Sequence, residues 1–199
     1  MNKISSAQRK KILKFAEEEY KNNDVNHDFR HAKLTARLAL SLAKQEGADE
    51  DICEIAGLLH DVAHRISKKN HAAIGASKVK QFLKKIKVDA EIANRICCAM
   101  SHHNERSYKA HKGAKAKEEK VVFDADRLLA LGPIGFCRDF TYCILYAKMQ
   151  PYDAVLDGEN YVLTRYKQLK TKSARRIGKK AQEVMEIFYK VFKSQYKNG

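Results

Sequence analysis

The chain has 199 residues, of which 39 are Lys or Arg and 24 are Asp or Glu, and its formal net charge is +15 at pH 7. This length suits one domain with a full hydrophobic core. No signal-peptide core and no apolar run long enough to span a membrane occurs, which predicts a soluble, cytoplasmic protein with no membrane partner. The positive charge favours polyanionic or phosphorylated partners, and the five cysteines without CxxC spacing predict buried, reduced thiols.

Helical periodicity dominates and predicts an all-α fold, with one helical domain over residues 1–199. Asp28 is the expected N-cap of the second helix, in which the polar positions form one narrow stripe, as in a central helix. The basic segment between His103 and Lys120 predicts an exposed, mobile loop. The expected helices cover residues 6–20, 28–46, 49–61, 71–86, 89–102, 120–131, 134–148, 158–170 and 173–196.

Two histidines lie on the inward faces of neighbouring expected helices. His60 shares a face with Ala56, and His31 shares one with Leu38. A single inward histidine is more often a core residue bonded to a carbonyl. Two inward histidines occur here, and Asp61 can reach around the end of the helix toward them. For this set a structural role and a metal site are about equally good interpretations.

The expected helix 120–131 carries two carboxylates with different neighbours. The residues three and four positions from Asp126 are all apolar. Burying its carboxylate alone would cost several kcal/mol, so it must be paired or metal-bound. Asp124 is within reach of Lys120 and Arg127, and we interpret it as an exposed helix ion pair.

Two imidazoles and two carboxylates form a mixed nitrogen and oxygen ligand set. Such a set suits Mn, Fe, Ni, Co or Mg with open positions better than a closed structural zinc site. A metal held in this way lowers the pKa of a bound water molecule and polarises a phosphoryl oxygen, as phosphoester hydrolysis requires.

These residues carry a resemblance to a known family. His31, then His60 with Asp61, then Asp126 match the H…HD…D pattern of the HD-domain superfamily of metal-dependent phosphohydrolases. The segments NHDFRHAKLTARLAL, AGLLHDVAH and FDADRLLALGPIGFCR are similar to those of small stand-alone HD proteins. The motif core covers residues 26–138, and a helical C-terminal extension over 150–199 shows a weaker likeness.

The resemblance implies an HD-type helical bundle that binds a divalent metal ion through these four side chains and acts on nucleotides or other phosphate esters. Dinuclear branches of the family add histidines after the HD motif. A second metal is therefore one interpretation of three further histidines, and contact with substrate or a plain surface position is the other. These are His71, His102 and His103, of which His103 is expected to face inward.

The roles of several polar residues around the metal stay open. His64, His71 and His103 are candidates for protonating the leaving oxygen. His64 is expected to support the metal site rather than bind the ion. Arg30, Arg127 or lysines of the 109–120 loop are candidates for binding the phosphate.

Two positions depart from the family pattern. Leu34 stands where small HD proteins commonly carry Arg, and Leu129 stands where they commonly carry Asp. Metal binding should survive, but substrate preference or activity could differ. We interpret the two leucines as replacing an ion pair.

Three other functions compete with this interpretation. A metalloprotease would use His60 and His64 at the spacing of HExxH, but that leaves His31 and Asp126 unexplained. A nucleic-acid-binding module would use the Lys and Arg residues of 161–182, where no acid occurs. The third is a non-catalytic HD-type sensor of a phosphorylated ligand.

The favoured function is a metal-dependent phosphohydrolase that acts on a nucleotide or other small phosphate ester with metal-activated water. The alternatives are the sensor and a nucleic-acid-directed phosphodiesterase. The oligomeric state does not follow from the sequence.

Overall fold

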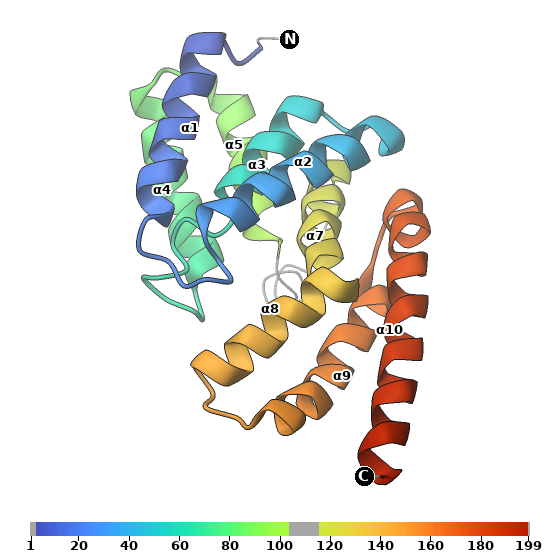
Figure 1. Cartoon of the computed structure of the whole chain (residues 1–199). Coiled ribbons are helices and arrows are strands. Elements are labelled where there is room, and N and C mark those ends of the chain that lie inside the picture. Colours follow the sequence, from blue (N-terminus) through green and yellow to red (C-terminus); the bar gives the residue numbers. More distant parts are fainter. Residues whose placement is uncertain (1–2, 104–115, 199) are drawn as a thin grey trace. The chain divides into compact units, whose positions relative to one another are not determined.

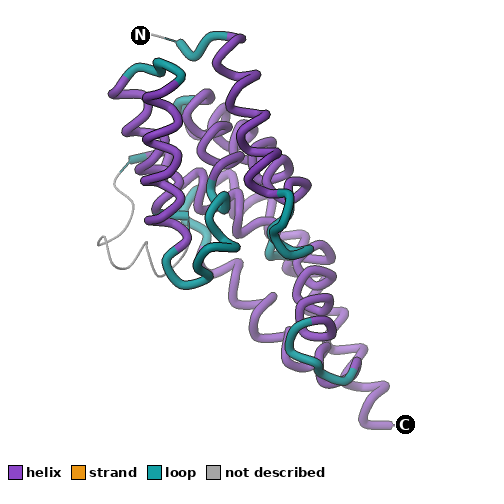
Figure 2. The backbone as a smooth tube through the Cα atoms, turned by 90° about the vertical axis from the view of Figure 1, so that its left-hand side faces the viewer, coloured by secondary structure: helices purple, strands orange, loops and turns teal. Residues whose placement is uncertain are grey.

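The structure is a computed structural model that describes residues 3–103 and 116–198. Within these ranges the chain forms nine α-helices and no strand, so the predicted all-α class is confirmed (Figure 2). The helices divide into two compact units, Met1–Asp126 and Arg127–Gly199. Whether the chain is one domain, as the sequence predicts, is not tested by this division and stays a prediction.

The first unit contains α1 to α5 and most of α7 (Figure 1). Here α2 packs along α3, α3 packs on α5, and α4 packs on α5, while α1 contacts both α2 and α3. The helix bounds are α1 Ser6–Tyr20, α2 Phe29–Glu46, α3 Glu50–Leu59, α4 His71–Lys85, α5 Ala90–Ser101 and α7 Lys117–Leu129.

Side-chain caps explain where three of these helices begin. The carboxylates of Asp28, Asp49 and Asp89 accept hydrogen bonds from backbone amides in the first turns of α2, α3 and α5. Each cap satisfies an amide that has no partner inside the helix. The predicted cap at Asp28 is therefore confirmed. The bounds predicted for the first helix, 6–20, are also confirmed by α1.

The predicted polar stripe on α2 is also confirmed, because Lys33, Arg37, Ser41 and Lys44 are all exposed while the opposite face is buried. Gly57 of α3 permits the close approach of α2. A Cβ atom at Gly57 would lie 3.1 Å from the Cα atom of Ala36.

The second unit contains α8, α9 and α10, which pack on one another (Figure 1). Its core consists of Val155, Val162, Met185 and Tyr189, with phenylalanines of α8 and α10 packed around them. The bounds are α8 Gly132–Leu145, α9 Pro151–Gln168 and α10 Lys172–Asn198.

Two predicted helix starts were wrong. α9 begins at Pro151, seven residues before the expected position 158, because proline fits the first turn of a helix, where no amide hydrogen is needed. α7 begins at Lys117 rather than at 120, with two acids in its first turn. Most of the expected loop between His103 and Lys120 lies outside the described residues.

No single helix in the described ranges is long and apolar enough to cross a membrane. The bent pair α7 and α8 meets the length and composition test only when the two helices are taken together.

Candidate metal centre

Several helix ends of the first unit bring histidines and carboxylates together. His31 lies in the first turn of α2, where its backbone amide donates to the Asp28 cap at 2.8 Å. His60 ends α3, and Asp61 follows it directly. His71 begins α4 and His103 lies just beyond the end of α5. Because the side chains come from helix ends, they can converge without breaking the helix packing.

The first group of potential ligands consists of His31, His60 and Asp126. The Oδ1 atom of Asp126 is 3.3 Å from His31 Nε2 and 3.8 Å from His60 Nε2. Both imidazoles are buried, whereas the Asp126 side chain keeps some exposure.

The second group consists of Asp61, His71 and His103, all of them buried. The Oδ1 atom of Asp61 is 3.2 Å from His71 Nε2 and 3.3 Å from His103 Nε2. The two Nε2 atoms are 3.0 Å apart.

Asp61 faces both groups with different oxygen atoms. Its Oδ2 atom is 3.1 Å from His60 Nε2 and 3.9 Å from His31 Nε2, while Oδ1 faces the second group. One carboxylate is therefore shared by two sets of nitrogen atoms, which is the arrangement that a bridging ligand between two cations requires.

The hydrogen bonds of three rings fix which nitrogen faces inward. The Nδ1 atoms of His60, His71 and His103 donate to the backbone carbonyl oxygens of Gly57, Lys68 and Met100, at 2.8, 3.0 and 2.5 Å. In a neutral ring the Nε2 atom then carries the lone pair. Backbone carbonyls commonly orient metal-bound histidines in this way.

This set of donors fits a divalent metal ion. The buried Nε2 atom of His60 has no hydrogen-bond partner. The lone pairs of His71 and His103 face each other at 3.0 Å, which is repulsive unless positive charge lies beside them. Nitrogen and oxygen donors with no thiolate favour Mn, Fe, Ni, Co or Mg.

The electrostatics of the centre favour positive charge. Burial opposes the charged form of His60, but the carboxylates of Asp61 and Asp126 outweigh it and raise the pKa of His60 to about 9. Burial would raise the pKa of Asp61, yet His60 and His103 hold it well below its usual value. The carboxylates therefore attract a cation, whether a proton or a metal.

The backbone of Asp61 is held by residues that the sequence did not single out. Its amide donates to the Tyr20 hydroxyl oxygen at 3.0 Å, and its carbonyl accepts from Asn23 Nδ2 at 3.3 Å. Burial and the nearby Asp61 raise the pKa of Tyr20 well above its ordinary value, which keeps the phenol neutral.

The first turn of α7, which leads to Asp126, is fixed by Glu118. This carboxylate accepts from the amide of Asp49 at 3.1 Å and from Arg95 at 3.0 Å. Lys117 also donates to the carbonyl oxygens of Glu46 and Gly47 at the C-terminal end of α2.

A third group lies next to the first two, and two of its members, Asp24 and His27, were not predicted from the sequence, whereas His64 was expected to support the metal site. Asp24 accepts from His27 Nδ1 at 2.7 Å and lies 3.6 Å from His64 Nδ1, and the two rings stack with centroids 3.6 Å apart. Burial and His27 lower the pKa of His64 to about 4. The only sequence signal was the polar loop in which Asp24 and His27 occur.

The stacked rings connect to both ligand groups. The His27 ring lies 6.2 Å from that of His31, and the His64 ring lies 5.2 Å from that of His71. The Nδ1 atoms of His27 and His64 both face the carboxylate of Asp24, and we interpret these two rings as a support for the neighbouring ligand groups.

Other candidate residues lie outside the metal groups. His102 Nδ1 is 2.8 Å from the carbonyl oxygen of Cys98 and 3.6 Å from Glu119. Arg30 is exposed in the first turn of α2. Arg127 is buried in the second unit. The phosphate-binding roles of Arg30 and Arg127 stay predictions.

Asp124 corrects one interpretation. It was expected to form an exposed helix ion pair, but its side chain is completely buried. The pattern of charged neighbours at helical spacing gave no information on what covers that face of α7. The suggested ion-pair replacement by Leu34 and Leu129 stays a prediction, because these residues belong to different units.

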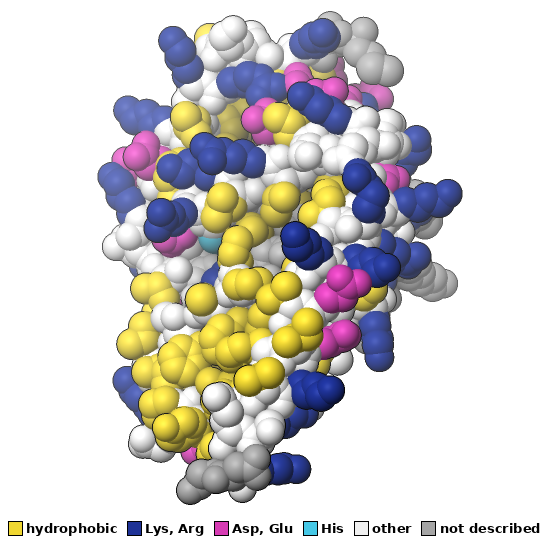
Figure 3. All heavy atoms as spheres, turned by 45° about the vertical axis from the view of Figure 1, so that its right-hand side comes forward, with side chains coloured by type: hydrophobic (Ala, Val, Ile, Leu, Met, Phe, Trp, Pro, Cys, Tyr) yellow, Lys and Arg dark blue, Asp and Glu magenta, His cyan; other side chains and the backbone are white. Residues whose placement is uncertain are grey.

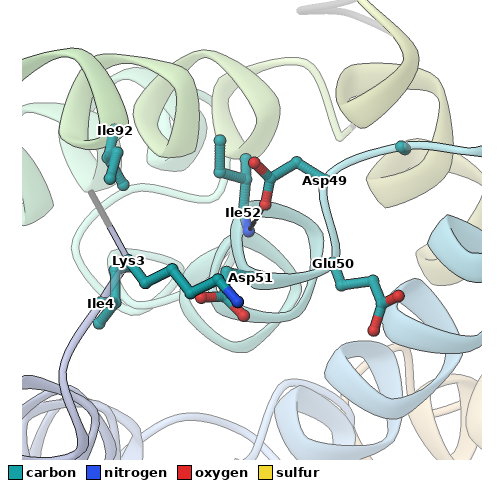
Figure 4. A pocket seen from close by; sticks show the side chains of 8 residues that line it. Lys3, Ile4, Asp49, Glu50, Asp51, Ile52 and Ile92 are labelled. Carbon is teal, nitrogen blue, oxygen red and sulfur yellow. Dashed lines mark hydrogen bonds between the residues drawn. The ribbon is translucent and has the colours of Figure 1, made fainter. Parts of the chain in front are cut away.

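An acidic pocket of the first unit lies away from this centre. A pocket of about 380 Å³ lies at the N-terminus of α3, the end opposite to His60 (Figure 4). Asp49, which lines it, uses its carboxylate to cap Ile52 of α3 at 3.1 Å. None of the candidate metal ligands lines this pocket.

Comparison with known proteins agrees with this geometry. The HD domain model matches residues 28–131, about half of the chain. The chain is 32% identical over 117 residues to the uncharacterised protein YpgQ of Bacillus subtilis. That match covers 58% of this chain and 57% of YpgQ, which is less than two thirds of its length.

Solved structures share the fold. The crystal structure of Bacillus subtilis YpgQ in complex with ADP has a TM-score of 0.73 and 23% identity, and the match covers 94% of this chain and 97% of that one. A crystal structure of an HD-superfamily hydrolase from Bacillus thuringiensis has a TM-score of 0.73 and 26% identity, with 97% and 98% covered. The ordered histidines and aspartates, the helical fold and the family match agree: the chain belongs to the HD domain family.

Proposed function

We propose that this protein is a metal-dependent phosphohydrolase that acts on a nucleotide or another small phosphate ester. The observation that carries the proposal is the position of Asp61, whose two carboxylate oxygens face two separate sets of imidazoles. A purely structural aspartate would need neither set, and the family relationship to HD-superfamily hydrolases supports the same chemistry.

In this proposal His31, His60, Asp61 and Asp126 hold one divalent ion, and His71 with His103 adds a second ion on the other side of Asp61. When bound, such an ion supplies a water molecule of lowered pKa and neutralises charge on a phosphoryl oxygen. The backbone carbonyls that accept from Nδ1 of His60, His71 and His103 keep the three rings in position.

A nucleotide is the favoured substrate class. The fold neighbour YpgQ was crystallised with ADP. The net charge of +15 attracts anionic substrates, and exposed Arg30 lies one residue before His31, where its guanidinium can reach a phosphate. His64, held against Asp24 beside His71, has a pKa lowered to about 4 by burial and His27, so its ring is neutral at pH 7 and suits a supporting role better than protonation of the leaving oxygen.

The test combines metal analysis with a substrate screen. The purified protein is loaded in turn with Mn, Ni, Co and Mg, and phosphate release is measured from nucleoside mono-, di- and triphosphates, p-nitrophenyl phosphate and single-stranded RNA. We expect hydrolysis of small phosphate esters or nucleotides that is lost in Asp61→Asn together with bound metal.

The matched control is His102→Asn, since His102 lies outside both groups. Nucleotide binding without hydrolysis under every metal condition would replace the enzyme by a sensor of a phosphorylated ligand. Hydrolysis of RNA but of no mononucleotide would favour a nucleic-acid-directed phosphodiesterase. Full metal content in Asp126→Ala would remove Asp126 from the ligand set.

A further inference from the structure

The last helix, α10, carries a row of exposed aliphatic side chains. Ile187 is 64% exposed, Val191 50%, Val184 43% and Ile177 39%. Their spacings of seven, three and four residues place all four on one face of the helix. Isolated exposed aliphatic residues are common, but a row along one helix face marks an interaction surface.

This exposed row adjoins the face with which α10 packs in its own unit. Met185 and Tyr189 are buried there, and Phe188 and Phe192 pack against aromatic rings of α8 and α9. The apolar surface of α10 is therefore wider than the part that its own unit covers, and the row is the exposed part. Figure 3 shows hydrophobic side chains gathered over the lower half of the view, with charged side chains beside them.

The charged residues beside the row can pair with those of a second, antiparallel copy of the same helix. Glu183 and Lys190 are both exposed, lie seven residues apart and therefore share one edge of the row. In an antiparallel pair of identical helices that meet between Val184 and Ile187, Glu183 of each helix lies near Lys190 of the other. The point midway between Val184 and Ile187 and the point midway between Glu183 and Lys190 lie one residue apart, about 1.5 Å along the helix axis. One two-fold axis can therefore serve both the apolar contact and the charged contact.

We propose that the exposed row of α10 binds the same row of a second copy of this chain, antiparallel and with two-fold symmetry. Such an interface is isologous, so Val184 packs on the partner's Ile187 twice and Glu183 pairs with the partner's Lys190 twice. The proposal does not depend on the function of the metal centre.

The position of one acid favours a second copy over an anionic membrane. α10 carries eight Lys or Arg residues and only two Glu, and its overall charge would attract anionic lipid, but Glu183 lies at the edge of the row and would face the lipid headgroups. Lys180 falls within the row one turn before Val184, where a charged side chain weakens the contact but fixes the register.

The interface is small. The row from Ile177 to Val191 is roughly 22 Å long at 1.5 Å per residue, so one helix face buries less than the roughly 800 Å² per partner of a standard interface. We therefore expect a concentration-dependent dimer with a dissociation constant on the order of micromolar.

The experiment is sedimentation velocity of the full chain at about 1 to 200 µM, a range that brackets the expected constant. The wild type should pass from monomer to dimer, and Ile187→Asp should remain monomeric. Leu13→Asp is the control, because Leu13 of α1 is similarly exposed and lies outside the row. Far-ultraviolet circular dichroism establishes that each variant is folded.

Charge reversal tests the pairing itself. Glu183→Lys and Lys190→Glu should each weaken the dimer about tenfold, and the double variant should restore it, which a non-specific contact would not do. A wild type that stays monomeric throughout, or a dimer that Ile187→Asp leaves intact, would overturn the proposal. So would a monomer that binds vesicles of phosphatidylglycerol through Ile187, since the row would then dock on lipid.

Discussion

At the scale of single residues, the position of Asp61 depends on contacts made by its backbone. Tyr20 at the end of α1 accepts the hydrogen bond of the Asp61 amide, and Asn23 donates to its carbonyl oxygen. These bonds orient a carboxylate that faces four imidazoles. The geometry of the candidate metal centre therefore depends on residues that lie outside its two ligand groups.

Removing the Tyr20 hydroxyl tests this dependence. In Tyr20→Phe the buried amide of Asp61 loses its acceptor, which should lower the free energy of unfolding by about 1–2 kcal/mol. Metal affinity should fall as well, because Asp61 gains freedom. Urea unfolding and metal titration measure the two effects. Tyr152→Phe, at an exposed tyrosine of α9, should change neither.

Two adjacent histidines differ in their relation to the second ligand group, since His103 belongs to it and His102 does not. His103 is buried against Asp61, whereas His102 lies near Glu119 outside the group. His103→Asn should reduce the metal content from two ions per chain to one, because an amide is a poor substitute for an imidazole at this position. Elemental analysis of the purified variants measures this. An unchanged content in His103→Asn, or an equal loss in His102→Asn, would contradict a second ion at this position.

The candidate site could be predicted in part from the sequence. Helical periodicity gave the inward directions of His31, His60 and His103, because periodicity reports which residues share a face. It could not identify Tyr20 or Asn23, whose contacts with Asp61 bridge residues far apart in the chain. Asp124 was misjudged for the same reason, since its burial depends on neighbours in space rather than in sequence.

At the scale of elements, the contact between α2 and α3 sets the distance between His31 and His60. Gly57→Ala would place a methyl group 3.1 Å from the Cα atom of Ala36 and 3.2 Å from the Cβ atom of Ala39. We expect this substitution to push the helices apart and to cost about 1–3 kcal/mol of stability, together with some metal affinity.

Gly75 of α4 provides the matched comparison for Gly57. A Cβ atom there would make ordinary contacts at 3.5 to 3.6 Å. Because alanine favours the helix, Gly75→Ala should stabilise the protein by about 0.4–1 kcal/mol. Chemical denaturation of both variants measures whether their changes in the free energy of unfolding have opposite signs. Equal effects would mean that packing against Ala36 does not limit the approach of α2.

Helix boundaries were predictable where capping residues are strong local signals. Asp28 marked the start of α2 because its side chain caps the first turn. α9 was missed over its first two turns, since residues 151–157 are mixed in polarity and their helical state depends on packing, with Ala154 and Val155 buried. The pattern of residues alone does not report such packing.

At the scale of the whole molecule, the clustering of carboxylates and imidazoles in the first unit favours the binding of a cation. The centre brings two buried imidazole groups around the carboxylates of Asp61 and Asp126. The pKa of Asp61 lies well below its usual value, so this carboxylate stays ionised and requires a positive partner. A ligand that binds only the folded chain stabilises it in proportion to the logarithm of its concentration.

Metal removal should therefore lower the melting temperature. A metal at about 100 times its dissociation constant contributes about 2.7 kcal/mol, which corresponds to roughly 5–10 °C for a chain of this size. Differential scanning calorimetry with and without a chelator measures the shift, and added Mn or Ni should reverse it. Asp61→Asn should show no shift, because both ligand groups lose their shared carboxylate. An equal shift in that variant would place the stabilising ion elsewhere in the molecule and separate the stability of the fold from the proposed metal centre.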